Sequence, residues 1–485
     1  MNRSLEETPR TMASTDSTAH SRLSLPALLG FSLPGFTLGA LSVSVSVYLP
    51  HFYAAHVGLS LAAVGGAFGV VRLFDSVLDP ILGVTMDQSR TRFGRYRPWL
   101  TASAPVLMLG VYLLFEPPPM AGMGYLFAAL AVYYVGISLM TLSHVSWASV
   151  IAGQYHERSR VFGAIQMIGV TGATLILILP IVLAKQGAAD GGVSAMGWFI
   201  LTAAPLGVVL ATLRTPEPIA DHTHEDQLGW RDYVAIVTRP DVLRIFAADI
   251  CLTLGPGWMS ALYLFYFHDS RGFGAGEASR LLLIYIAAGV VGALTISRLA
   301  MRIGKHRAQM AASTGYSLGL LALTLTPKGA FWPVALVMFL LGLLAGSFPM
   351  LDRAMMGDVA DAIRLEQGKR RIGLLFAMIT TAQKVAVALS ILLSFAVLQW
   401  IGYHAKDGVA NTPQAIHGLE LVYLIGPVVF VMLGGACYIG YKLDSARHAE
   451  IRAQLEARDA LGPGGSILGG LGGEQMPPAA VVDAF

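Results

Sequence analysis

The sequence predicts an all-α membrane protein with about twelve transmembrane helices in two six-helix bundles, and three observations support this fold class. First, 55% of the 485 residues are hydrophobic and only 13% are charged, whereas soluble proteins carry about 25% charged residues. Second, about twelve apolar segments reach the length of about 20 residues that a bilayer span requires. Third, basic residues gather in the tails and in alternate loops, as in polytopic membrane proteins.

The elements follow one another in a regular order. Residues 1–24 are polar and predict a disordered cytoplasmic tail, without the small-residue cleavage signature of a signal peptide. The first bundle is expected over residues 25–214, with spans centred near residues 38, 70, 107, 133, 172 and 204. A cytoplasmic linker is expected over residues 215–240. The second bundle is expected over residues 241–444, with spans centred near residues 256, 286, 317, 343, 386 and 430. Residues 445–485 read as a second cytoplasmic tail, a charged helix followed by a Gly/Pro-rich end.

Orientation follows from the 33 Lys and Arg residues, most of which lie in the two tails and the even-numbered loops. Because Lys and Arg resist translocation when they lie close to span ends, both termini are predicted to be cytoplasmic. The net charge of +3 therefore reflects topology and gives no reason to invoke nucleic acid. The only two cysteines, Cys251 and Cys437, fall in predicted spans and offer neither a disulfide framework nor a thiolate metal site.

A short internal repeat supports the two-bundle arrangement. The loop after the second span reads Arg-Phe-Gly-Arg-Tyr-Arg over residues 92–97, and the loop after the eighth reads Arg-Ile-Gly-Lys-His-Arg over residues 302–307. An offset of six helices between matched loops is what parallel repeats produce in transporters.

Three charged residues, Arg72, Asp75 and Asp79, lie inside the second apolar segment and precede Pro80. Each costs about 2.5–3.5 kcal/mol at mid-membrane depth, so three together indicate a function. Their spacing of three and four residues places them on one helical face, where Arg72 can neutralise Asp75.

Asp75 and Asp79 are the predicted cation-binding residues. Their carboxylates are suited to bind either Na⁺ or a proton. If the ion is Na⁺, Asp75 and Asp79 are also the one candidate metal site. The alternative is a static buried ion-pair network. Lys384, in the eleventh predicted span, has no acidic residue one turn away on its own helix, so it needs a partner elsewhere. We expect it to reach Asp75 and Asp79 and to act with Arg72 in coupling.

A second group of charged residues lies near the cytoplasmic ends of predicted spans and is assigned to gating, as a charge latch that breaks and reforms when the bundles rock. Its members are Asp87, Arg92, Arg95, Arg97, Arg158, Arg160, Asp358, Asp361, Arg370 and Arg371. The competing interpretation of the basic members is positive-inside anchoring.

Other polar residues leave alternatives open. His144 in the fourth span is either a structural histidine or a substrate ligand, and Asp249, Asp352 and Arg353 have no assigned role. The His/Asp-rich part of the linker is expected to be solvated rather than metal-binding. No nucleophile motif or phosphate-cradling loop occurs, so the sequence predicts that the protein is not an enzyme and has no cofactor other than a coupling ion. The energy for transport is expected to come from an ion gradient.

The stretch from Arg72 to Gly83, continued by Phe93 to Trp99, resembles the glycoside-pentoside-hexuronide:cation symporter family, which includes melibiose permease, within the major facilitator superfamily. Residues 356–361 and 368–373 followed by Lys384 are similar to a second family motif, and Trp147 with residues 155–158 to a weaker third. The resemblance implies a major facilitator fold with alternating access, a cation site at Asp75 and Asp79, and a matching lysine at Lys384.

The same resemblance does not identify the transported solute. Sugar-transporting members grip hydroxyl groups with an aspartate in span one and another in span four, and Gly39 and Ser143 stand at those positions here. The substrate-binding set is accordingly Gly39, Ser143, His144 and Trp147. The Ser143–Val145 stretch also resembles the lysophospholipid carriers of the broader family, so a less hydroxylated or anionic substrate stays open.

The sequence therefore predicts a symporter that couples Na⁺ or H⁺ to transport of a small organic solute, with a glycoside or uronide favoured by family resemblance. One alternative is a cation-coupled carrier of lysophospholipids or amphipathic solutes, and another is a transporter-like sensor without translocation. The expected partners are the lipid bilayer and the solute, without nucleic acid. A monomer in the cell membrane is expected, in the inner membrane if the source is a Gram-negative bacterium.

Overall fold

The computed structural model describes residues 23–89, 91–151, 155–184, 192–215, 217, 235–367 and 372–460. Within these ranges the regular structure is helical, apart from an isolated bridge between Thr91 and Gly94. The predicted all-α class is therefore confirmed.

The helices before the linker cross the molecule in alternating directions. They are α1 (Leu25–Val43), the π-helix η1 (Ser44–Tyr48), α2 (Leu49–Ala55), α3 (Leu61–Gln88), α4 (Arg97–Phe115), α5 (Met123–Ile151), α6 (Tyr155–Ile176), α7 (Ile178–Leu183) and α8 (Val193–Arg214). Ser60 precedes α3 as its N-cap. Its hydroxyl accepts a hydrogen bond from the backbone N–H of Ala63 at 3.2 Å, which satisfies one of the free amides of the first turn.

The helices after the linker repeat this alternation. They are α10 (Pro240–Phe265), the π-helix η3 (Tyr266–Ser270), α11 (Ala275–Ile303), α12 (Lys305–Leu325), α13 (Phe331–Ala345), α14 (Phe348–Gln367), α15 (Ile372–Trp400), α16 (Pro413–Ala436) and α17 (Ser445–Ala460).

Eleven helical stretches of the described residues are long and apolar enough to cross a membrane. They contain every predicted span centre except the one near residue 317, which lies on α12. Helices α13 and α14 together make one of these stretches, Phe331–Gln367. A multi-pass membrane protein is thus confirmed, while α12 is too polar to meet the same criterion.

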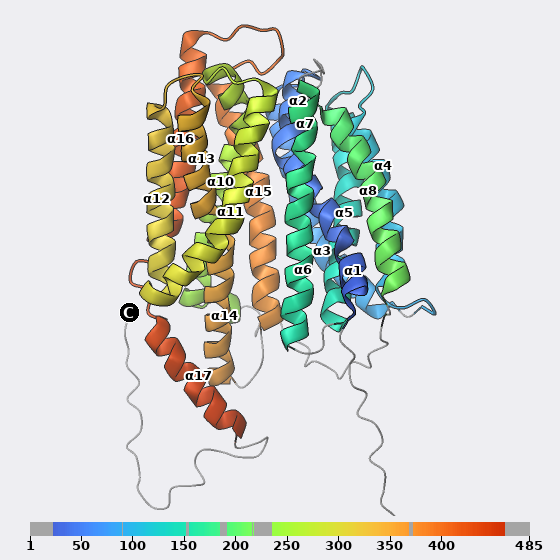
Figure 1. Cartoon of the computed structure of the whole chain (residues 1–485), viewed down its shortest axis with the longest axis vertical. Coiled ribbons are helices and arrows are strands. Elements are labelled where there is room, and N and C mark those ends of the chain that lie inside the picture. Colours follow the sequence, from blue (N-terminus) through green and yellow to red (C-terminus); the bar gives the residue numbers. More distant parts are fainter. Residues whose placement is uncertain are drawn as a thin grey trace, which may run out of the picture.

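Helix packing divides the molecule into an N-terminal group, α1–α8, and a C-terminal group, α10–α16 (Figure 1). In the first, α1 packs on α6 and α8, and α4 packs on α5 and α8; in the second, α10 packs on α16 and α11 on α13. The groups meet where α3 packs on α15, α7 on α11, and α2 with η1 on α10. We call the end where α1 begins and α17 lies the terminal end, and the other the opposite end.

Each of the repeated loop sequences contains a glycine with positive φ. Gly94, between α3 and α4, has a φ of 114°, and Gly304, between α11 and α12, has a φ of 92°. These positive values favour glycine because a Cβ would be strained there. The internal repeat therefore has a structural counterpart in both groups.

Close approach of backbones also explains two small residues within the bundles. A Cβ on Gly39 of α1 would collide with the carbonyl of Gly169 on α6, and a Cβ on Gly346 would collide with the backbone of Gly289 on α11. Small residues at helix contacts of this kind permit the tight packing on which membrane helices depend.

Candidate functional site

The Asp75 carboxylate is the centre of the charged cluster and is 3% exposed. Its Oδ1 accepts a hydrogen bond from Ser138 Oγ of α5 at 2.5 Å. Its Oδ2 accepts from Lys384 Nζ of α15 at 2.9 Å and from Arg72 Nη1 at 3.5 Å. Both oxygens are therefore paired, one with a hydroxyl and one with two cations.

Lys384 joins the two groups of helices at this point. Besides Asp75, its ammonium contacts Asp79 Oδ2 and lies 3.3 Å from Ser138 Oγ. The structure thus brings together the four residues whose association was expected from the sequence. The other oxygen of Asp79, Oδ1, is buried without a hydrogen-bond partner in the described part of the chain.

The cluster contains equal numbers of positive and negative groups, because Arg72 and Lys384 stand against Asp75 and Asp79. Buried charges are retained in membranes only when such pairing offsets their desolvation. The side chains of Arg72, Asp79 and Lys384 keep 15–20% exposure while that of Asp75 keeps 1%. Asp79, Lys384 and Arg72 are therefore less deeply buried than Asp75.

Two members of the site were missed by the sequence interpretation, namely Ser138 and Tyr134. They lie one turn apart on α5, and the guanidinium of Arg72 stands 4.8 Å from the centre of the Tyr134 ring. A cation above an aromatic ring is stabilised by the ring quadrupole. The only sequence signal was their spacing of four residues in an apolar span, which is also typical of helix packing.

The four predicted substrate-binding residues lie within the N-terminal group. Gly39 is at the α1–α6 contact, the hydroxyl of Ser143 donates to the Leu139 carbonyl at 2.6 Å, and Trp147 is fully buried. His144 is also fully buried, with Nε2 at 2.7 Å from the Phe31 carbonyl and its ring tilted against the Phe31 ring. These contacts match the structural interpretation of His144, and the substrate role of the four residues stays a prediction.

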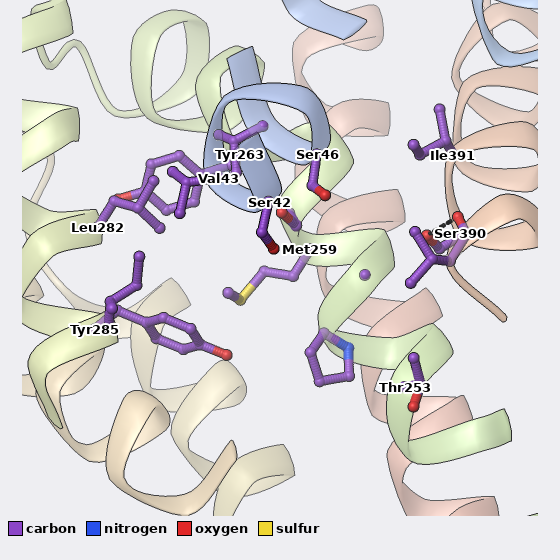
Figure 2. A pocket seen from close by; sticks show the side chains of 16 residues that line it. Ser42, Val43, Ser46, Thr253, Met259, Tyr263, Leu282, Tyr285, Ser390 and Ile391 are labelled. Atoms are coloured by element: carbon purple, nitrogen blue, oxygen red, sulfur yellow. Dashed lines mark hydrogen bonds between the residues drawn. The ribbon is translucent and has the colours of Figure 1, made fainter. Parts of the chain in front are cut away.

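A cavity of about 260 Å³ lies instead between the two groups. Its lining residues come from α1, η1, α10, α11 and α15, and those with hydroxyl groups are Ser42, Ser46, Thr253, Ser260, Tyr263, Tyr285 and Ser390. Figure 2 shows the Tyr285 ring and the Met259 side chain extending into the space below Ser42. None of the described residues that line it is Asp, Glu, Lys, Arg or His.

The cavity and the charged cluster share a helix. Val387, Ser390 and Ile391 of α15 line the cavity, and Lys384 lies one helical turn before Val387. A movement of α15 that shifts Lys384 would therefore also move one wall of the cavity.

Several predicted gating residues meet at the turn between α3 and α4. Asp87 Oδ1 accepts a hydrogen bond from the Tyr96 hydroxyl at 2.7 Å, and the Arg95 guanidinium contacts the Asp87 carbonyl. Burial and the bond to Asp87 raise the pKa of the Tyr96 phenol well above its usual value, so it stays a donor at neutral pH. The Arg92 guanidinium stands 4.9 Å from the centre of the Phe93 ring.

Glu217, at the start of the linker, is a further partner that the sequence interpretation missed. Its Oε1 accepts from the backbone N–H groups of Arg95 and Tyr96, both at 2.7 Å, and its Oε2 from that of Arg97 at 3.1 Å. A carboxylate at the first turn of α4 satisfies free amides and interacts favourably with the helix dipole. No local pattern links it to a turn more than a hundred residues earlier.

The remaining gating residues have other partners. Arg97 donates to the Thr215 carbonyl at 2.7 Å, and Arg160 pairs with Glu157 at 3.3 Å. Asp358 of α14 binds Lys305 of α12 at 2.7 Å, and Asp361 lies 3.2 Å from His448 of α17. Arg370, Arg371 and the side chain of Arg158 lie outside the described residues, as does most of the predicted linker.

Residues 30–445 match the family model described as MFS/sugar transport protein. The uncharacterized symporter YnaJ of Bacillus subtilis is 28% identical, over 90% of this chain and 96% of that protein. The isoprimeverose transporter of Lactiplantibacillus pentosus is 26% identical, over 89% of this chain and 91% of its own.

Among solved structures, the nucleoside transporter NupG superposes with a TM-score of 0.61 and 15% identity, over 86% of this chain and 100% of that chain. At this identity the likeness shows the fold alone.

Proposed function

Because the chain belongs to the MFS/sugar transport protein family, we propose that it is a secondary-active symporter, which couples Na⁺ or H⁺ to transport of a small organic solute by alternating access. The family confirms the resemblance carried by the motifs, and it makes the chain a multi-pass transporter of the cell membrane rather than an enzyme. In this proposal α12 also crosses the membrane, as the ninth of twelve spans, both termini are cytoplasmic, and the carrier works as a monomer.

One observation carries the coupling proposal: Lys384 bridges Asp75 and Asp79 from the other group of helices. A cation that binds the two carboxylates competes with the ammonium for the same oxygens. Binding of the cation then breaks the link between α3 and α15, and release of the cation restores it. Occupancy of the ion site thus biases the relative position of the two groups, which is what coupling requires.

The ligands around Lys384 suit either ion. Asp75, Asp79 and the Ser138 hydroxyl supply hard oxygens of the kind that Na⁺ coordinates, with water or backbone carbonyls completing the shell. The unpartnered Oδ1 of Asp79 is equally suited to receive a proton. The choice between the ions is left to experiment.

The cavity supports a small, uncharged, hydroxylated solute. Its hydroxyl side chains donate and accept hydrogen bonds, and its volume of about 260 Å³ is below the about 300–1,000 Å³ of pockets for drug-sized ligands. The isoprimeverose transporter among the relatives agrees with such cargo. A lysophospholipid fits less well, since no described lining residue is a cation that would pair with its phosphate.

Contacts at the opposite end support a conformation closed on that side. Tyr48 and Ser279 hydroxyls lie 2.8 Å apart, and Asp407 donates its backbone N–H to the Ala55 carbonyl at 2.9 Å. Both bonds join the two groups. With cytoplasmic termini, the opposite end faces outward, so alternating access requires these bonds to break when the carrier opens outward.

The proposal is tested by uptake into proteoliposomes under an imposed Na⁺ or H⁺ gradient. We expect Asp75→Asn and Asp79→Asn to abolish accumulation of solute against its gradient, because each removes a ligand of the coupling ion, while exchange of solute across the membrane persists. Glu116→Gln is the matched control, since Glu116 binds Trp198 at a distance from the cluster. Normal accumulation in both Asp variants, or indifference of the wild type to both the Na⁺ and the H⁺ gradient, would overturn the coupling site.

A further inference from the structure

A second set of buried polar residues lies in the C-terminal group and takes no part in the site described above. Asp352 of α14 is 0% exposed and Asp249 of α10 is 1% exposed. Gln309 of α12 and Tyr438, just after α16, complete the set around Asp352, and both are fully buried. Four elements of the C-terminal group thus converge on one carboxyl group.

The contacts of Asp352 come from neutral donors. Its Oδ1 accepts a hydrogen bond from the Tyr438 hydroxyl at 2.6 Å and another from Gln309 Nε2 at 3.2 Å. In the described part of the chain no Lys, Arg or His forms an ion pair with Asp352. An ionised carboxylate in this position would be a buried charge without a counter-ion, which proteins avoid by taking up a proton.

Two atoms of this set lack a partner. Asp352 Oδ2 and Gln309 Oε1 are both buried, and neither has a hydrogen-bond partner in the described residues. Both accept hydrogen bonds when Asp352 is ionised, so they cannot satisfy one another in that state. A single hydrogen on Oδ2 turns the carboxyl group into a donor, for which the amide oxygen of Gln309 is the available acceptor.

Arg353 and Asp249, the other charged residues of this region, are linked to each other through Gln383. Arg353 donates to Gln383 Oε1 at 3.3 Å, and the same glutamine donates from Nε2 to Asp249 Oδ1 at 2.9 Å. The positive charge of Arg353 also acts on Asp249. It therefore compensates Asp249, and Asp352 faces the negative charge of Asp249 without a cation of its own.

The described elements packed against Asp352 offer it no compensating positive charge, since Arg244 of α10 donates to the backbone carbonyls of Ile439 and Gly440. Helix α10 offers Asp249, the chain after α16 offers Cys437 and Tyr438, and α12 offers Gln309 and Lys305. Lys305 binds both oxygens of Asp358 at 2.7 Å, further along α14. None of these supplies a free positive charge to Asp352.

We propose that Asp352 binds a proton and pairs, as a neutral carboxylic acid, with the side-chain amide of Gln309. The amide N–H donates to Oδ1, the acid O–H on Oδ2 donates to Oε1, and the two bonds close a ring. Tyr438 donates a further bond to Oδ1. This protonation site is separate from Asp75 and Asp79 and does not rest on the proposed symport.

Infrared spectroscopy of the purified full-length protein at neutral pH tests the assignment. A protonated carboxyl group has a C=O band distinct from that of a carboxylate, and the band moves when H₂O is exchanged for D₂O. We expect this band in the wild type, its persistence in Asp249→Asn, and its loss in Asp352→Asn. Absence of the band from the wild type, its persistence in Asp352→Asn, or its loss in Asp249→Asn alone would overturn the proposal.

Stability gives an independent readout. Asn at position 352 presents an oxygen and an NH₂ group where the neutral acid presents an oxygen and an O–H, so Asp352→Asn should keep the wild-type melting temperature. Should that variant fail to fold, Gln309→Leu replaces it. Removal of the amide partner is expected to shift the carboxyl band, and an unchanged band would contradict the pairing.

Discussion

Lys384 occupies the position of an internal cation between Asp75 and Asp79. Because its side chain is 15% exposed and that of Asp75 only 1%, the pair lies largely out of water. Removing one partner of such a pair costs about 3–5 kcal/mol, since the remaining charge stays buried. The lysine and the transported cation are therefore expected to substitute for one another.

This substitution predicts the behaviour of Lys384→Ala. Without the ammonium, Arg72 alone faces two carboxylates, so the variant should melt at a lower temperature than the wild type in ion-free buffer at neutral pH. The coupling ion should restore the melting temperature, and whichever of Na⁺ or acidic pH does so identifies it. The measurement is thermal denaturation of the purified protein.

A surface lysine provides the comparison for that experiment. Lys328 pairs with Glu420 at 3.1 Å, but its side chain is 66% exposed, and such pairs contribute only about 0–1 kcal/mol. Lys328→Ala should therefore leave the melting temperature and its ion dependence unchanged. A Lys384→Ala protein that melts like the wild type in ion-free buffer would contradict the internal-cation role.

At the site, the sequence predicted the residues that share a helix better than those that meet across helices. The spacing of Arg72, Asp75 and Asp79 places them on one face, and the lack of an acidic residue near Lys384 on its own helix indicated a distant partner. Ser138 and Tyr134 were missed because their contact depends on the register between α3 and α5. Glu217 was missed because its partners are backbone amides, which every residue carries.

Among the elements, α12 shows why apolarity alone underestimates the number of buried helices. Its residues Gln309, Ser313, Tyr316 and Ser317 are buried against neighbouring helices, while Leu318, Leu321 and Leu325 are exposed. Polar groups in membrane helices face the bundle interior in this way. The mean apolarity of α12 is therefore low although its outward face is apolar, which is why this predicted span does not meet the hydropathy criterion that the other stretches meet.

Helix contact also predicts the effect of adding one methyl group to α1. In Gly39→Ala the new Cβ would collide with the Gly169 carbonyl of α6, whereas in Gly66→Ala of α3 it would meet nothing within 4 Å. Overpacking of this kind costs about 1–3 kcal/mol of stability, so we expect Gly39→Ala to lower the melting temperature. Gly66→Ala should leave it unchanged. Thermal denaturation of the two purified variants measures this.

The same pair of variants bears on the substrate role predicted for Gly39. If Gly39 serves packing alone, the Km for solute should be unchanged in whatever fraction of Gly39→Ala folds. A raised Km at unaltered stability would instead favour contact with the solute.

For the whole molecule, eleven of the twelve predicted span centres fall in helical stretches long and apolar enough to cross a membrane, whereas the pairing of the helices was not predicted. The division into two bundles was predicted from the linker and from the repeated loop, whose glycines both adopt positive φ. Contacts between the groups, such as α3 on α15, depend on the fit of side chains that lie about three hundred positions apart in the sequence. No periodicity in a single sequence encodes such fits.

Orientation in the membrane is testable with single cysteines in a background where Cys251 and Cys437 are serine. Met120, in the loop after α4 at the opposite end, is 95% exposed, and Glu450 of α17 is exposed at the terminal end. In intact cells a membrane-impermeant maleimide should label Met120→Cys and not Glu450→Cys. Permeabilised cells should show labelling of both, and the reverse pattern in intact cells would place the termini outside.

The equal numbers of positive and negative groups around Lys384 have an electrical consequence. In the proposed symport, with Arg72 and Lys384 balancing Asp75 and Asp79, the empty carrier would reorient without moving net charge from this cluster, and a bound cation would add one elementary charge. A membrane voltage contributes about 2.3 kcal/mol per charge for each 100 mV. Voltage would therefore drive the loaded step and leave the return step unaffected, so that uptake of an uncharged solute carries an inward current.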